Sequence, residues 1–82
     1  MSLKNYRFTY YFETTVLKRR PYLMKEWCIY TIENAEYSEP QELNRFRYWA
    51  QIPELENRYL RVVTLADLTT IHNAFPDRGF KK

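Results

Sequence analysis

The stretch RFRYWAQI, residues 45–52, alternates its side chains with the period of two that is typical of a half-buried β-strand. One face of such a strand carries Phe46, Tyr48, Ala50 and Ile52, and the other carries Arg45, Arg47, Trp49 and Gln51. The same alternation returns in RYLRVVTL (58–65) and in TTIHNAF (69–75), each after a short link. Three consecutive strands with short links predict an antiparallel β-meander.

The alternation also assigns side chains to faces. In the last strand it sets Ile71, Asn73 and Phe75 on one face and Thr70, His72 and Ala74 on the other. In the first strand we expect Tyr48 in the core and Trp49 at the surface, and either ring could stack on a nucleobase.

Before these strands the pattern changes to that of helices. The clearest helix is predicted over residues 22–34, where two adjacent rows of apolar side chains form a wide stripe and Asn34 suits the C-cap. An earlier helix is expected over about 9–20, with a short strand at Arg7–Tyr10 as the competing interpretation. Pro21 blocks its continuation.

The predicted fold class is therefore α+β, with two N-terminal helices packed on a three- to four-stranded antiparallel β-meander. The helices occupy about 9–34 and the meander about 36–75, where a weak edge strand at 36–42 is the fourth member. With 82 residues the chain makes a single domain, 1–82, which ends in a basic tail at 76–82.

Composition narrows the class of protein. The chain is 45% apolar and 18% aromatic, which predicts a folded core, and its apolar runs are too short to cross a membrane. Its first residues lack the pattern of a secretory signal. The single cysteine, Cys28, lies on an apolar helix stripe and is expected to be a small core residue rather than a nucleophile. We expect a soluble cytoplasmic protein.

Charge is unevenly distributed. Between Glu26 and Asn44 there are five acids and no Lys or Arg, whereas the remainder holds thirteen basic residues against five acids. This asymmetry predicts a basic surface with an acidic patch elsewhere, and a basic surface suits a polyanion such as RNA. A solvated surface of mixed charge is the alternative.

Several kinds of chemistry are disfavoured by composition. One glycine cannot build a phosphate-binding loop, and one His with one Cys cannot build a zinc site, so we expect no metal and no cofactor. A Ser-His-Asp site is not excluded, but the two serines lie in a terminus and in a predicted edge segment. Arginine-rich chemistry on a sheet face remains.

Two residues carry that interpretation. Arg61 is surrounded by mostly apolar residues, so it needs an acidic partner or an anionic ligand. Cleavage of RNA needs charge stabilisation and proton transfer, and His72, with an ordinary pKa of about 6.5, is the candidate for the second. The alternatives are a structural, hydrogen-bonding His72, a solvent-facing Arg45 and Arg47, and a local turn at Asp77-Arg78.

The segments RRPYLMKEWCIYTIEN, RFRYWAQI, RYLRVVTL and TTIHNAFPDRGF resemble a family of small uncharacterised prokaryotic proteins. That family is distantly similar to the RelE/BrnT-like superfamily of toxin ribonucleases from type II toxin–antitoxin modules. The match covers about residues 8–80, and its ending has the form aromatic-x-Asp-Arg, here Phe75, Asp77 and Arg78.

The resemblance implies an RNA-cleaving toxin, acting on free or ribosome-bound mRNA and neutralised by a small antitoxin protein. By position in the chain, the resemblance implies that Arg61, His72 and Arg78 are catalytic and that Lys81 and Lys82 bind phosphate. The RNA-binding residues are expected to include Arg45, Arg47 and Tyr48. The alternative function is a non-catalytic module that uses the same basic face to bind RNA or a protein.

Overall fold

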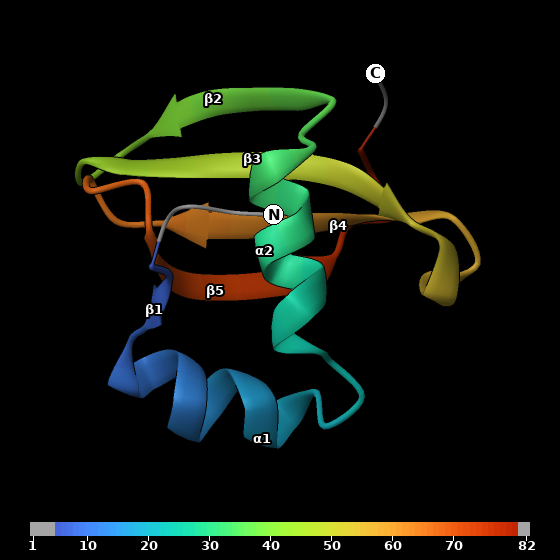
Figure 1. The fold of residues 1–82 in the computed structure, drawn as a ribbon, viewed down its shortest axis with the longest axis horizontal. Helices are drawn as coiled ribbons and strands as arrows, with labels where there is room; N and C mark the ends of the chain where they lie inside the picture. Colours follow the sequence, from blue (N-terminus) through green and yellow to red (C-terminus); the bar gives the residue numbers. More distant parts are fainter. Residues whose placement is uncertain (1–4, 81–82) are drawn as a thin grey trace.

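The computed structural model describes residues 5–80 and has an α+β fold, as the sequence predicts. In chain order its elements are β1 (Arg7–Phe8), η1 (Phe12–Val16), α1 (Leu17–Arg19), α2 (Lys25–Glu33), β2 (Tyr37–Gln41), β3 (Arg45–Ile52), η2 (Pro53–Leu55), β4 (Arg58–Thr64) and β5 (Thr70–Pro76). The strands form one sheet; α2 crosses one of its faces, and α1 lies beside its β5 side (Figure 1).

The sheet has five strands in the order β1-β5-β4-β3-β2. Strands β2 to β5 pair antiparallel in sequence order, but β1 pairs parallel to β5. There the Arg7 N–H donates to the Thr69 carbonyl and the Thr9 N–H to the Ile71 carbonyl, both at 3.0 Å. The predicted antiparallel meander is present as the four strands β2–β5. The sheet as a whole is not purely antiparallel, because β1 adds a fifth, parallel strand within residues 7–10, where a strand was the competing interpretation.

The first helical segment is less regular than predicted. Residues 10–19 are helical throughout, close to the predicted 9–20, but η1 in the middle is a π-helical turn and α1 comprises only the last three residues. The Thr9 hydroxyl accepts a hydrogen bond from the Phe12 N–H at 3.1 Å, which satisfies a free donor at the start of the turn. Phe12 and Val16 are buried and face the core, whereas Tyr11 is 41% exposed.

Helix α2 begins later and ends where predicted. It starts at Lys25 rather than at residue 22, because Met24 has extended backbone angles (φ −99°, ψ 134°). At the other end, the Asn34 side-chain amide donates to the Tyr30 carbonyl at 3.0 Å, and Asn34 is the C-cap, as predicted.

The core lies between α2, η1 and the covered face of the sheet. Its buried members come from every layer: Phe12, Val16, Leu23, Cys28, Ile52, Leu55, Leu60, Val62, Ile71 and Ala74. Cys28 is 0% exposed, and burial raises the pKa of its thiol to about 12. The thiol is therefore protonated at neutral pH, and the prediction that Cys28 is a core residue is confirmed.

Strand β5 contains a bulge that the sequence pattern does not reveal. The register between β4 and β5 shifts between Ile71 and Asn73, which leaves His72 as the extra residue. As a result Ile71 faces the core, 0% exposed, while Asn73 and Phe75 lie on the opposite face. The prediction that Ile71, Asn73 and Phe75 share a face is therefore wrong.

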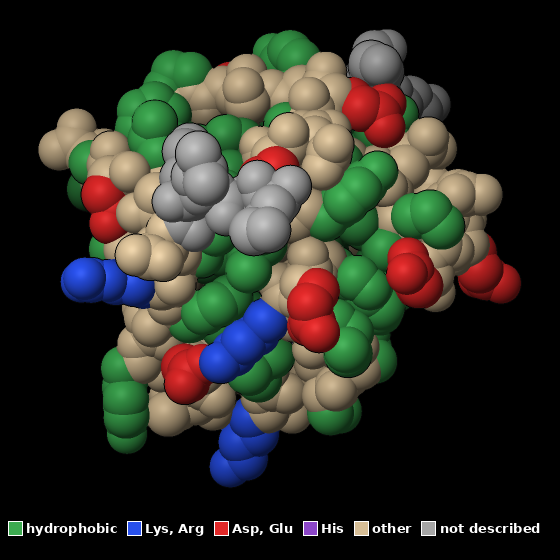
Figure 2. Space-filling view, in the orientation of Figure 1, with side chains coloured by type: hydrophobic (Ala, Val, Ile, Leu, Met, Phe, Trp, Pro, Cys, Tyr) green, Lys and Arg blue, Asp and Glu red, His purple; other side chains and the backbone are tan. Residues whose placement is uncertain are grey.

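The surface on the α2 side mixes acidic and hydrophobic side chains with a few basic ones (Figure 2). In the part of the chain that the structure describes, no helix combines the length and the apolar character needed to cross a membrane.

Candidate nucleic-acid interface

The face of the sheet that points away from α2, which we call the open face, is organised in rows across the strands. Strand pairing places Tyr37, Trp49, Arg61 and Phe75 in one row. The neighbouring row holds Glu39, Arg47, Val63 and Asn73. Because opposite residues of paired strands lie on the same face, charged and aromatic side chains become neighbours here.

Arginines and rings alternate across this face, in a set of five residues that we call the arginine–aromatic ladder: Arg47, Trp49, Arg61, Phe75 and Arg20. The guanidinium carbon of Arg61 lies 5.6 Å from the ring centre of Trp49 and 5.2 Å from that of Phe75. Arg47 lies 5.7 Å from the Trp49 ring, and Arg20, at the end of α1, lies 5.6 Å from the Phe75 ring. Cations within about 6 Å of a ring face are attracted to it, so the rings hold the guanidinium groups in place.

Asp77 anchors the middle of the ladder. Its Oδ2 accepts a hydrogen bond from Trp49 Nε1 at 3.0 Å and lies 3.8 Å from the Arg61 guanidinium. The side chains of Arg61 and Asp77 are only 23% and 19% exposed. Arg61 is therefore partly buried, and Asp77 is the acidic partner that such an arginine requires.

The chain beyond β5 folds across the open face. The Asp77 N–H donates to the Tyr59 carbonyl at 2.9 Å, and the Phe80 ring stacks on Trp49 with centres 4.7 Å apart and planes 14° apart. Phe80 also contacts the rings of Tyr59 and Tyr37 at 4.8 and 5.9 Å. Trp49 is therefore only 4% exposed, and the prediction that it lies at the surface is wrong because the C-terminal residues cover it.

A hollow of about 480 Å³ adjoins the ladder, lined by Pro40, Gln41, Glu42, Leu43, Arg47 and Arg61. The Nε–H groups of both arginines are shielded from solvent and donate to no acceptor among residues 5–80. Arg47 Nε is 3.5 Å from a Glu39 carboxylate oxygen, which is an ion pair without hydrogen-bond geometry. The shielded Gln41 side-chain oxygen also accepts no hydrogen bond in this range. A ligand that offers both acceptors and a donor, as a nucleotide does, matches these groups.

His72 lies at the opposite end of β5 from Asp77. Its Nδ1 is 3.1 Å from the Thr9 hydroxyl, and its ring stacks on Tyr11 at 4.9 Å. Partial burial, and next the positive charge of Arg45, lower the pKa of His72 below its ordinary value. The imidazole is therefore mainly neutral at pH 7 and able to accept a proton. These contacts equally fit a structural, hydrogen-bonding His72.

The three residues predicted as catalytic are spread along the sheet. Arg61 is opposite Phe75, which lies three residues beyond His72 along β5, or about 10 Å. Arg78 is exposed and follows the end of β5. The structure does not gather the three around one point, and their catalytic role stays a prediction.

The residues predicted to bind RNA are divided between the faces. Arg45 and Arg47 lie on the open face of β3, where they pair with Gln41 and Glu39 of β2. Tyr48 points to the opposite, helix-covered face and is half-buried. Lys81 and Lys82 lie outside the described residues.

Sequence reasoning missed three members of this site: Arg20, Phe75 and Phe80. The ending FPDRGF does hold two rings on either side of Asp77, which is a signal of an aromatic contact near a charge. Nothing in the one-dimensional pattern, however, indicates that Arg20 at the end of a helix reaches the Phe75 ring.

No cluster of three or more His, Cys, Asp or Glu side chains within residues 5–80 is placed to hold a metal ion. No protein-family model, curated protein or solved structure matches the chain. The resemblance to RelE/BrnT-like toxins therefore stays a prediction, and function is argued from the site itself.

Proposed function

We propose that this protein binds single-stranded RNA on the open face of its sheet. The observation that carries the proposal is the arginine–aromatic ladder. Proteins hold single strands by combining positive charge that follows the phosphates with rings on which bases stack. RNA bases also stack on the planes of arginine guanidinium groups.

Two groups of side chains would contact different parts of the RNA, the phosphates and the bases. Arg47 and Arg61, whose Nε–H groups donate no hydrogen bond within residues 5–80, line the hollow and suit a phosphate. Phe75 would offer a ring face to a base, and Trp49 would do so once a base replaces the stacked ring of Phe80. The acids nearby, Glu39 and Asp77 among them, limit the total positive charge of this face. Binding by placed contacts rather than by bulk charge predicts a modest salt dependence, with a slope of about −0.7 per phosphate contact.

The test is fluorescence anisotropy with a labelled oligouridine of about ten nucleotides, at several salt concentrations. Arg61→Ala and Arg47→Ala should each weaken binding by roughly tenfold, or about 1.4 kcal/mol. Arg61→Lys keeps the charge but loses the planar fork, so it should give an intermediate loss.

Lys18→Ala is the matched control, because it removes one exposed positive charge from α1, outside the ladder. Its effect should be less than about twofold. If Lys18→Ala weakened binding as much as Arg61→Ala, binding would depend on overall charge and the proposed site would be wrong. No binding at low salt would reject the function itself.

A second candidate is an RNA-cleaving toxin that a small antitoxin protein neutralises. The feature that favours it is His72, whose Nδ1 lies 3.1 Å from the Thr9 hydroxyl and whose pKa is lowered by partial burial and by the positive charge of Arg45. A neutral imidazole can take the proton of a ribose 2′-hydroxyl, whose oxygen attacks phosphorus as the 5′-oxygen leaves, and an arginine stabilises the charge that develops.

This candidate is tested by incubating RNA, free and ribosome-bound, with the protein and by inducing its expression in cells. Cleavage and growth arrest should be lost in His72→Gln and in Arg45→Ala. Intact RNA and normal growth with the unaltered protein would remove the enzyme and leave RNA binding standing.

A further inference from the structure

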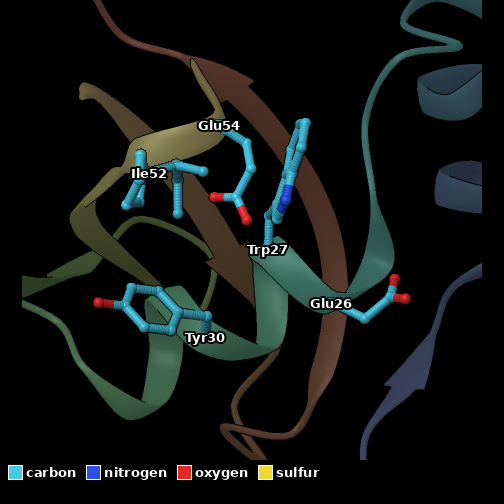
Figure 3. A pocket seen from close by; sticks show the side chains of 6 residues that line it. Glu26, Trp27, Tyr30, Ile52 and Glu54 are labelled. Atoms are coloured by element: carbon cyan, nitrogen blue, oxygen red, sulfur yellow. The ribbon is translucent and has the colours of Figure 1, made fainter. Parts of the chain in front are cut away.

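A second hollow lies on the other side of the molecule, between α2 and the end of β3 (Figure 3). It measures about 310 Å³ and is lined by Glu26, Trp27, Tyr30, Ile52, Pro53 and Glu54. Figure 3 shows the Glu54 carboxylate turned toward the side of Trp27 and Tyr30, whereas Glu26 points away from the hollow. One carboxylate thus faces a space with aromatic and aliphatic walls.

The charge of Glu54 is unmatched within the described chain. The carboxylates of Glu13, Glu39, Glu56 and Asp77 each have a Lys or Arg partner. Among residues 5–80, Glu54 has none. A carboxylate beside aromatic rings favours a cation, because the ring faces and the negative charge attract the same group.

We propose that this hollow is a docking site for an arginine side chain of a partner protein. The planar guanidinium stacks on rings such as those of Trp27 and Tyr30 and pairs with a carboxylate through two parallel hydrogen bonds. The aliphatic stem packs on apolar surface, which Pro53 provides beside the buried Ile52. The volume is at the lower end of the range for ligand sites, about 300–1,000 Å³, and suits one long side chain.

The surroundings favour a basic protein segment as the source of that arginine. Helix α2 also presents Glu26 and Glu33 as exposed acids, and from Glu26 to Asn44 the chain has no Lys or Arg. A segment with further basic residues would gain from this field. Since α2 covers the face opposite the ladder, the partner leaves the proposed RNA face uncovered.

The two tryptophans allow the two faces to be read separately. Trp27 lines this hollow and Trp49 lies in the ladder, so their indole N–H signals in NMR report on different sites. The probe is a short Gly-Leu-Arg-Leu-Gly peptide, compared with a twin that carries citrulline, the neutral isostere of arginine. The arginine peptide should shift the Trp27 signal and not that of Trp49, with Kd on the order of 0.1–1 mM.

The citrulline twin and Glu54→Gln should each weaken binding by about tenfold, since each removes one of the two charges. Glu56→Gln is the matched control, because Glu56 is two residues away and its side chain is 89% exposed. Tyr30→Leu, at a position that is 45% exposed, should weaken binding without unfolding the chain. An unchanged Trp49 signal verifies the fold of each variant.

Three results would overturn the proposal. Equal binding of the citrulline twin would make the hollow a plain apolar contact. Equal affinity for free arginine amide would assign the site to a small cation instead of a protein. No shift of Trp27 at millimolar peptide would show that nothing of this chemistry binds. None of these results tests RNA binding, which is followed through the NMR signal of Trp49 on the open face.

Discussion

The two faces of the sheet are packed by different means. Under α2 the sheet buries aliphatic side chains, and Leu60, Val62 and Ile71 are all 0% exposed. On the open face Trp49 is almost as fully buried, at 4%, but its cover is the stacked ring of Phe80 and its indole is tied to Asp77.

Because of this difference in packing, the covered face contributes mainly to stability and the open face is suited to ligand binding. Each buried aliphatic side chain contributes about 1.5–3 kcal/mol, whereas a ring pair adds about 0.5–1.5 kcal/mol beyond its buried area. A cover that is made of one ring and a few polar contacts can be exchanged for a ligand at low cost. The covered face cannot open without unfolding the domain.

The largest expected effect is a loss of stability when a core side chain is shortened, and it should differ between the two faces of the sheet. Leu60→Ala, on the covered face, should lower the free energy of unfolding by about 2–5 kcal/mol, since it leaves a cavity in the core. Val63→Ala, on the open face and 4% exposed, should cost about 1.5 kcal/mol. Urea unfolding measures both. Equal losses would mean that the open face is a second hydrophobic core.

Removal of the Phe80 ring should open the ladder. Phe80→Ala is expected to lower the free energy of unfolding by about 1–2 kcal/mol and to expose Trp49. In a Trp27→Phe background, acrylamide should then quench Trp49 fluorescence more strongly, and oligouridine should bind more tightly. Tyr10→Ala, at an 82% exposed ring, is the control and should change neither. Unchanged quenching would show that Phe80 does not shield Trp49.

Neutralisation of Asp77 tests whether its negative charge limits RNA binding on the open face. Asp77→Asn keeps an oxygen that can accept the Trp49 hydrogen bond but releases Arg61 from its ion pair. Oligouridine affinity should rise by roughly fivefold, equivalent to about 1 kcal/mol. Asp67→Asn removes the same charge from the β4–β5 turn, where Asp67 accepts from the Thr69 and Thr70 N–H groups, and should have a smaller effect. An affinity that falls with Asp77→Asn would contradict the proposed role of Arg61.

The smallest effect concerns His72. NMR titration of this single histidine should give a pKa below about 6.5, and Arg45→Ala should raise it toward that value by removing a positive charge. Because the folded pKa is lowered, the associated stability is present above about pH 6.5 and is lost as the pH falls through the folded pKa. A pKa that does not move in Arg45→Ala would show that burial alone causes the shift.

Secondary structure was predicted correctly where a regular side-chain pattern within one segment is enough to specify it. The alternation in RFRYWAQI predicted β3, and the apolar stripe with Asn34 predicted α2 and its cap. The prediction failed in β5, where one extra residue interrupts the alternation of side chains. The bulge at His72 moved Ile71 into the core, and no alternating pattern can indicate which residue will be left unpaired.

The candidate site was predicted in part. Arg61 was identified because an arginine among apolar neighbours on a strand needs a charged partner wherever the strand lies. That its partner is Asp77, and that Phe75 and Phe80 complete the site, depends on which strands pair and in what register.

The α+β class, the main strands, helix α2 and the arginines on one side of β3 could be predicted from the chain alone, because those features depend on side-chain periodicity along a single segment. Folding in three dimensions brings Arg20, Arg47 and Arg61 against Trp49 and Phe75 in one ladder, and it turns Glu54 toward Trp27 and Tyr30. Those contacts join residues far apart in the chain, and their geometry is set by strand register and by the path of the last residues across the sheet.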